Sequence, residues 1–143
     1  MAAREGSAEW KGDLKGGSGQ LELGGGAFSG AYSFTSRFEE GEGTNPEELI
    51  AAAHAACFSM ALSNILAESG HEAESVDTTA GVHLRMGDDG PEIHRIDLRT
   101  TGRVPGIDED HFRKHAEEAK AGCPVSKALA GVPEITLDAT LAG

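Results

Sequence analysis

The chain has 143 residues and a formal net charge of −12, from 24 acidic and 12 basic side chains. This length favours one domain over residues 1–143, and the negative charge opposes binding to nucleic acid or to anionic membranes. There is no charged and apolar leader and there are only two cysteines, so we expect a cytoplasmic protein in which any disulfide is transient rather than structural.

The first 45 residues are rich in glycine and contain short alternating segments. Residues 8–12 and 19–23 flank a Gly/Ser turn and predict a β-hairpin. Residues 32–38 alternate over seven positions, which predicts a third strand with Arg37 and Phe38 on opposite faces. An acidic, glycine-rich loop at residues 39–43 should then lead into a helix.

Residues typical of helix ends mark the beginning and the end of one long helix. Asn45 suits the N-cap, Pro46 suits the first helical position, and Glu48 would complete a capping box. Gly70 supplies the left-handed residue that commonly ends a helix. We therefore expect a helix over about 46–69, roughly 35 Å long at 1.5 Å per residue.

The composition of this helix predicts burial on all sides. Nearly every side chain between Leu49 and Leu66 is apolar or small. His54 and Ser63 interrupt the run and large side chains are few, which argues against a membrane span. The alanine-rich half would let another backbone approach closely, such as a second copy of the same helix.

The rest of the chain predicts a second hairpin, two helices and a last strand. Residues 74–86 and 93–104 alternate on either side of a Gly/Asp/Pro turn. Residues 108–121 form a polar, amphipathic surface helix, and Pro124 starts a short helix over 124–130. Residues 134–141 alternate as a strand. The fold class is therefore α+β.

Two cysteines are the candidates for redox chemistry. Cys57 lies in the middle of the long helix, where a lone cysteine is either an inert apolar residue or a nucleophile. Cys123 precedes Pro124, so it either fills a turn or caps the short helix, whose N–H groups would lower the thiol pKa. The two thiols suit thiol–disulfide exchange if the fold brings them together.

A buried thiolate needs a positive partner, because burial alone raises the pKa of a thiol. Arg37 is the nearest candidate in sequence, unless it only balances Glu39 and Glu40 on the surface. Glu47 could orient the guanidinium through a bidentate pair, or merely favour the helix N-terminus. On one helix, Glu47 and Cys57 lie roughly 15 Å apart, so if they cooperate, Glu47 most simply comes from a second subunit, which predicts a dimer.

Three histidines support weaker alternatives. His54 lies one turn before Cys57 and is either a base or hydrogen-bond partner for it, or a packed core residue. His111 and His115 are spaced for one helical face, and either begin a zinc site or belong to a solvated surface. A third metal ligand is not evident, so we predict no metal centre.

Two segments resemble the OsmC subfamily of the OsmC/Ohr organic hydroperoxide reductases. They are residues 44–62, TNPEELIAAAHAACFSMAL, and residues 122–126, GCPVS. The resemblance extends over nearly the whole chain. It implies an intertwined homodimer in which curved antiparallel sheets wrap around long buried central helices, with smaller surface helices outside.

The resemblance also implies the chemistry. Cys57 matches the peroxidatic cysteine of the family and Cys123 matches the resolving cysteine. Arg37 and Glu47 match the arginine and glutamate that keep the peroxidatic cysteine in its thiolate form. The implied enzyme reduces organic hydroperoxides, and hydrogen peroxide less efficiently, in defence against oxidative and osmotic stress. It needs no metal, haem or flavin, and a dithiol reductant, in related enzymes a lipoyl-bearing protein, reopens the disulfide.

Two rival functions use the same sequence features. One is a redox-sensing or thiol-exchange protein with the same two cysteines but without efficient peroxide turnover. The other is a non-enzymatic dimer in which Cys57 is a core residue only.

Overall fold

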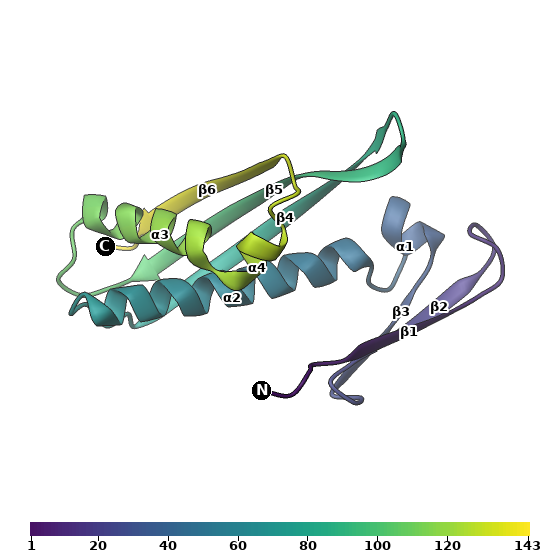
Figure 1. Ribbon diagram of the computed structural model, residues 1–143, viewed down its shortest axis with the longest axis horizontal. Coiled ribbons are helices and arrows are strands. Elements are labelled where there is room, and N and C mark those ends of the chain that lie inside the picture. The colour runs from purple at the N-terminus through teal and green to yellow at the C-terminus, as the bar shows by residue number, and fades with distance from the viewer. The chain divides into compact units, whose positions relative to one another are not determined.

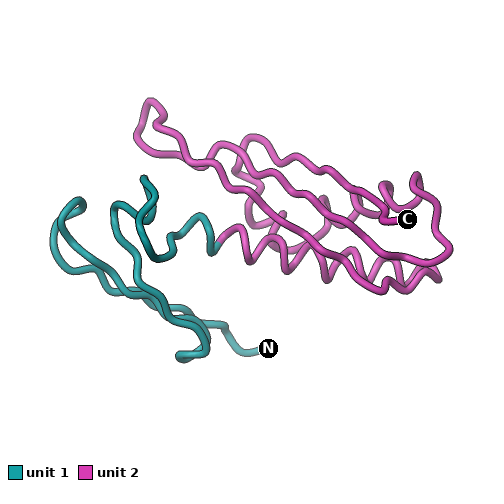
Figure 2. The backbone as a smooth tube through the Cα atoms, turned by 180° about the vertical axis from the view of Figure 1, so that it is seen from behind, with its two compact units in different colours: residues 1–49 teal, residues 50–143 magenta.

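The computed structural model describes residues 1–143 and contains two compact units, residues 1–49 and 50–143 (Figures 1 and 2). The first unit holds a small sheet and a short helix. The second holds a larger sheet with helices. The long helix begins in the first unit and continues through the second.

The first unit is built on a three-stranded antiparallel sheet. Its strands are β1 (Gly6–Lys11), β2 (Ser18–Leu23) and β3 (Phe28–Tyr32), paired in chain order. The predicted hairpin of β1 and β2 is therefore confirmed. On this sheet, Trp10 and Tyr32 pack with their ring centroids 5.4 Å apart.

The expected strand over residues 32–38 is wrong, because this segment forms helix α1 (Phe34–Phe38). Ser33 caps the helix: its Oγ accepts from Ser36 N at 3.1 Å, while Ser36 Oγ accepts from Ser33 N at 2.8 Å. These two bonds give the backbone an alternative to strand pairing that outweighs the alternating pattern. Arg37 consequently lies on a helix rather than on a strand.

Helix α2 (Pro46–Glu68) is confirmed close to its expected bounds. Asn45 Oδ1 accepts from Glu48 N at 2.8 Å, as expected of an N-cap. The Glu48 carboxylate accepts from Thr44 Oγ1 at 3.0 Å instead of returning to the N-cap backbone. Gly70 follows the helix with φ 88°, in the left-handed region.

Burial of α2 is confined to one side of the helix in the single chain. Phe58, Leu62 and Leu66 are fully buried, whereas Met60 is 76% exposed. By length and hydropathy alone α2 would qualify as a membrane span, a test that the core helix of a soluble protein also passes. The all-round burial that composition predicts is therefore not reached within one chain.

The second unit is a three-stranded sheet with helices. Strands β4 (Ser75–Gly87) and β5 (Gly90–Arg103) form the predicted antiparallel hairpin. Strand β6 (Glu134–Leu141) lies parallel to β5, so the expectation of purely antiparallel sheets is wrong for this pair. The reason is that α3 (Glu109–Gly122) and α4 (Pro124–Ala128) form a crossover between the two strands (Figure 1).

The core of the second unit lies between one face of this sheet and the helices. Alternate residues of β5, among them Ile96, Leu98 and Thr100, are buried, while Arg99 is exposed. The sheet therefore has one covered face. Apolar side chains of α2, α3, β5 and β6, together with Val104 directly after β5, form a single cluster: Phe58, Leu62, Leu66, Leu98, Val104, Phe112, Ala116, Ala119 and Ala139. This packing holds α2, α3 and the sheet together in the second unit.

Close packing of α3 on the sheet makes Gly102 sensitive to substitution. A Cβ at this position would overlap the ring of Phe112, which is fully buried. We expect Gly102→Ala to lower the free energy of unfolding by about 1–3 kcal/mol, as overpacking does, measured by urea denaturation. Gly131→Ala is the control, because its Cβ would meet no atom within 4 Å. Equal stability of the two variants would contradict this account.

Candidate active site

The structure brings the two cysteines together. Cys57 lies in the middle of α2, and Cys123 lies at the junction where α3 ends and α4 begins. Their side chains are within hydrogen-bonding distance, although both are free thiols. The packing of α2 and α3 into one core places these two sulfur atoms side by side.

Cys123 is the N-cap of α4, as expected, with Pro124 at the first helical position. Its Sγ accepts from Ser126 N at 3.3 Å and lies 3.2 Å from Ser126 Oγ. Burial by itself raises the pKa of this thiol, but the hydrogen bonds from Ser126, Cys57 and the backbone of Val125 outweigh it. The net effect is a pKa of Cys123 below its ordinary value.

For Cys57 the effects that raise the thiol pKa outweigh the one that lowers it. Burial raises the pKa of Cys57, and the adjacent Cys123 raises it further, while the backbone N–H of Val125 lowers it. Among its neighbours in the second unit, only this N–H favours the Cys57 thiolate. A strongly nucleophilic Cys57 would therefore need a positive charge that these neighbours do not supply.

His54 and Ser126 extend the site behind Cys123. His54 Nε2 lies 2.6 Å from Ser126 Oγ, which joins α2 to α4, and both side chains are buried. Burial lowers the pKa of His54. Ser126 was not among the predicted site residues, although its place three positions after the N-cap Cys123 is the capping spacing that could have indicated it.

Arg37 and Glu47 meet in the first unit. Arg37 Nε donates to Glu47 Oε1 at 2.8 Å, and the Glu47 side chain is 10% exposed. The bond is single, so the expected bidentate pair is not formed. Arg37 uses no other nitrogen for hydrogen bonding within the chain, and Glu47 Oε2 is buried without a partner. The pair thus retains donor capacity for a further group.

The other two candidate histidines have local partners. His111 Nδ1 lies 2.6 Å from Asp108 Oδ2, and His115 Nδ1 lies 3.4 Å from Glu118 Oε2. Each contact is with a residue three positions away along the start or middle of α3. The two histidines therefore fit the interpretation of a polar helix surface.

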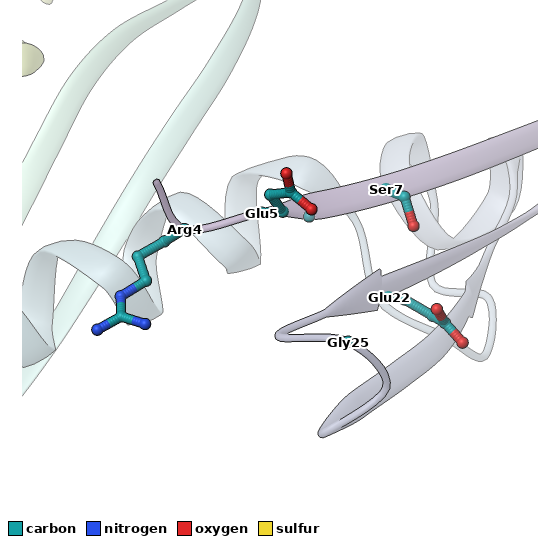
Figure 3. Close-up of a pocket in the computed structure, with 6 residues that line it drawn as sticks. Arg4, Glu5, Ser7, Glu22 and Gly25 are labelled. Atoms are coloured by element: carbon teal, nitrogen blue, oxygen red, sulfur yellow. The ribbon is translucent and has the colours of Figure 1, made fainter. Parts of the chain in front are cut away.

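A surface hollow of about 460 Å³ lies in the first unit and contains none of these groups. In Figure 3 the Arg4 side chain points away from Glu22. The lining residues are Arg4, Glu5, Gly6, Ser7, Glu22 and Gly25. The lining contains both basic and acidic side chains, and they do not point toward one common position. The candidate active site is accordingly defined by the thiols and their hydrogen bonds.

Comparison with known proteins identifies similar chains. A family model described as OsmC-like protein matches residues 39–138. The chain is 51% identical over 136 residues to the peroxiredoxin OsmC of Escherichia coli strain K12, with 94% of each chain covered. It is 34% identical over 100 residues to an organic hydroperoxide resistance protein of Xanthomonas axonopodis pv. citri, covering 68% of this chain and 67% of the relative.

The fold has solved counterparts. A crystal structure of an organic hydroperoxide resistance protein OsmC from Legionella pneumophila aligns over 100% of both chains with a TM-score of 0.72. The sequence identity is 23%, so this likeness concerns the fold alone. Together with the sequence relatives, it confirms the resemblance predicted from the helix motif and the second cysteine.

Proposed function

The chain belongs to the OsmC-like protein family of peroxide-reducing enzymes, and we propose that it reduces organic hydroperoxides with Cys57 as nucleophile and Cys123 as resolving thiol. It is a cysteine-based peroxidase, an oxidoreductase that serves in defence against peroxides. The observation that carries the residue assignment is the proximity of two free thiols, the half-buried Cys57 and the buried Cys123.

In the first step, the Cys57 thiolate attacks one oxygen of the hydroperoxide. An S–O bond forms, the O–O bond breaks, and the departing alkoxide takes a proton to leave as an alcohol. The Cys57 sulfur is oxidised to a sulfenic acid and the peroxide is reduced. The sequence around Cys57 is mostly apolar, which would favour alkyl hydroperoxides over hydrogen peroxide by a modest factor.

Arg37 is proposed to supply the charge that this step needs. Its terminal nitrogens are free to donate to a thiolate and to the developing alkoxide, while Glu47 holds the guanidinium through Nε. Such a charge would offset the burial that raises the pKa of Cys57.

A homodimer would allow Glu47 and Arg37 to act on a partner's Cys57. Ten helical positions separate Glu47 from Cys57, about 15 Å along one axis. The exposed side of α2 supports close approach of a second copy, because most of its side chains are small: Ala52, Ala53, Ala56, Met60, Asn64 and Ala67. Within such a dimer the two units of each chain would work as one domain over residues 1–143.

In the second step, Cys123 attacks the sulfenic sulfur of Cys57 and a disulfide forms with loss of water. A dithiol donor then reopens the disulfide by exchange. The resemblance implies a lipoyl-bearing protein as this donor. Because the cycle begins with reduced thiols, we place the enzyme in the cytoplasm.

The test is mass spectrometry of the reduced protein after one equivalent of tert-butyl hydroperoxide. We expect loss of two hydrogen atoms and a peptide in which Cys57 is linked to Cys123. Stopped-flow measurement of the same reaction should give a rate far above that of free cysteine. A rate no greater than that of free cysteine would remove the peroxidase assignment in favour of a redox-sensing thiol pair.

A further inference from the structure

A buried hydrogen-bond chain leads away from Cys123 and takes no part in the steps above. Cys123 Sγ lies 3.2 Å from Ser126 Oγ, and Ser126 Oγ lies 2.6 Å from His54 Nε2. His54 and Cys123 have no exposed surface, and Ser126 is 7% exposed. The chain therefore joins a thiol, a hydroxyl and an imidazole out of contact with bulk water.

The buried His54 side chain lowers the stability of the fold relative to an apolar side chain in the same place. His54 Nδ1 is buried without any partner, and an unsatisfied buried nitrogen is unfavourable by about 1–3 kcal/mol. An apolar side chain in this place would avoid that penalty. The histidine thus gains no stability from its second nitrogen, whereas its first nitrogen points along a path to sulfur.

We propose that Ser126 and His54 form a proton relay that accepts the proton of the Cys123 thiol and so generates the thiolate that attacks Cys57. This inference rests on the proposed function, because it concerns the resolving step of that reaction. Cys123 and Cys57 are the reacting atoms, and Ser126 and His54 act through Cys123 as positioning and proton-accepting residues.

Each proton in the relay has a donor and an acceptor. The Cys123 proton passes to Ser126 Oγ as the Ser126 hydroxyl proton passes to His54 Nε2. The Cys123 thiolate then forms the S–S bond while the S–O bond of the Cys57 sulfenic acid breaks, and hydroxide leaves. The hydroxide takes up the proton that His54 gives back, so the products are a disulfide and water. One sulfur is oxidised, the other is reduced, and no outside oxidant is used.

The protonation state of His54 suits this cycle. Burial lowers the pKa of His54, so the imidazole is neutral at pH 7 and can accept a proton, and the buried imidazolium readily returns it. The titratable groups at this point are His54 and Cys57 of α2 and Cys123. The other charged side chains of α4 and of the last turn of α3 are Lys127, which is exposed, and Lys120, which pairs with Glu117.

The test separates the two steps in a double-mixing stopped-flow experiment. Full-length reduced protein first meets one equivalent of tert-butyl hydroperoxide, and the Cys57 sulfenic acid and the disulfide are then followed by dimedone trapping and mass spectrometry. We expect Ser126→Ala and His54→Gln to slow disulfide formation at pH 7 by at least about tenfold, as loss of general base catalysis does. The sulfenic acid should persist correspondingly longer.

Two further variants and a pH profile distinguish the relay from simple packing. Ser126→Thr keeps the hydroxyl and should restore most of the rate. Thr100→Val removes a buried hydroxyl bonded to Thr78 and Asp77 instead, and should leave the disulfide rate unchanged. In His54→Gln the Cys123 thiol has no imidazole to accept its proton, so the midpoint of the rate against pH should move to higher pH.

The outcomes distinguish this inference from the proposed function. If Cys57 of the unsubstituted protein is not oxidised by the peroxide, the proposed function fails and the relay fails with it. If Cys57 is oxidised but His54→Gln forms the disulfide within about twofold of the normal rate, only the relay is overturned. A slowed variant whose pH midpoint stays in place overturns it equally, because that result describes a packing defect.

Discussion

Replacement of Cys57 by serine is expected to abolish hydroperoxide reduction. A serine hydroxyl in the same place is not ionised and cannot form a sulfenic acid. The loss of the nucleophile should lower kcat/KM on the order of 10³-fold or more. The measurement is consumption of tert-butyl hydroperoxide with excess dithiothreitol. Serine is close to cysteine in size, so circular dichroism should remain unchanged.

Two companion variants define the role of each thiol. Cys123→Ser should still consume about one equivalent of peroxide, because the first step does not need the second thiol. With one equivalent of peroxide and no reductant the sulfenic acid persists, and further peroxide consumes a second equivalent by oxidising it to sulfinic acid. Ser75→Ala, which removes an exposed hydroxyl at the start of β4, is the control and should retain full activity. Continued turnover by Cys57→Ser would refute the assignment of the nucleophile.

Replacement of Arg37 by methionine is expected to give the second largest effect. Methionine keeps much of the side-chain length but removes the charge that stabilises thiolate and alkoxide. We expect kcat/KM to fall about 10²- to 10³-fold, as when an oxyanion donor is lost. The pKa of Cys57, followed by thiolate absorbance, should rise. Glu47→Gln keeps the guanidinium and should lose less, about tenfold, since a charge-assisted bond becomes a neutral one.

Mixing two inactive variants tests whether Arg37 acts across a dimer. One chain carries Cys57→Ser with a normal Arg37, and the other carries Arg37→Met with a normal Cys57. If the sites are shared between subunits, co-expression should regain about a quarter of normal activity, because half the dimers are mixed and each has one complete site. Light scattering should give about twice the 14.8 kDa chain mass. A fully active particle of 14.8 kDa would exclude the dimer.

The elements with strong local signals could be predicted well. The cap at Asn45 and the apolar run placed α2 within a residue of its observed end, and the alternation of residues 134–141 matched β6. The strand expected over residues 32–38 failed because two serine hydroxyls formed a local capping box, which an alternating pattern does not reveal. The parallel direction of β6 was missed because the direction of pairing depends on the crossover helices.

The sequence by itself determined which residues could react: two thiols, an arginine and a glutamate within recognisable segments, and a helix start that makes Cys123 an N-cap. These follow from local chemistry along the chain. Only the tertiary structure decided that Cys57 and Cys123 touch, that Arg37 donates to Glu47, and that Ser126 joins His54 to Cys123. The physical reason is that the contacts of Cys57, Cys123, Ser126 and His54 depend on how α2, α3 and α4 lie in the second unit, and the Arg37–Glu47 bond depends on how α1 lies beside the start of α2 in the first. Tertiary contacts of this kind join residues that no local pattern relates.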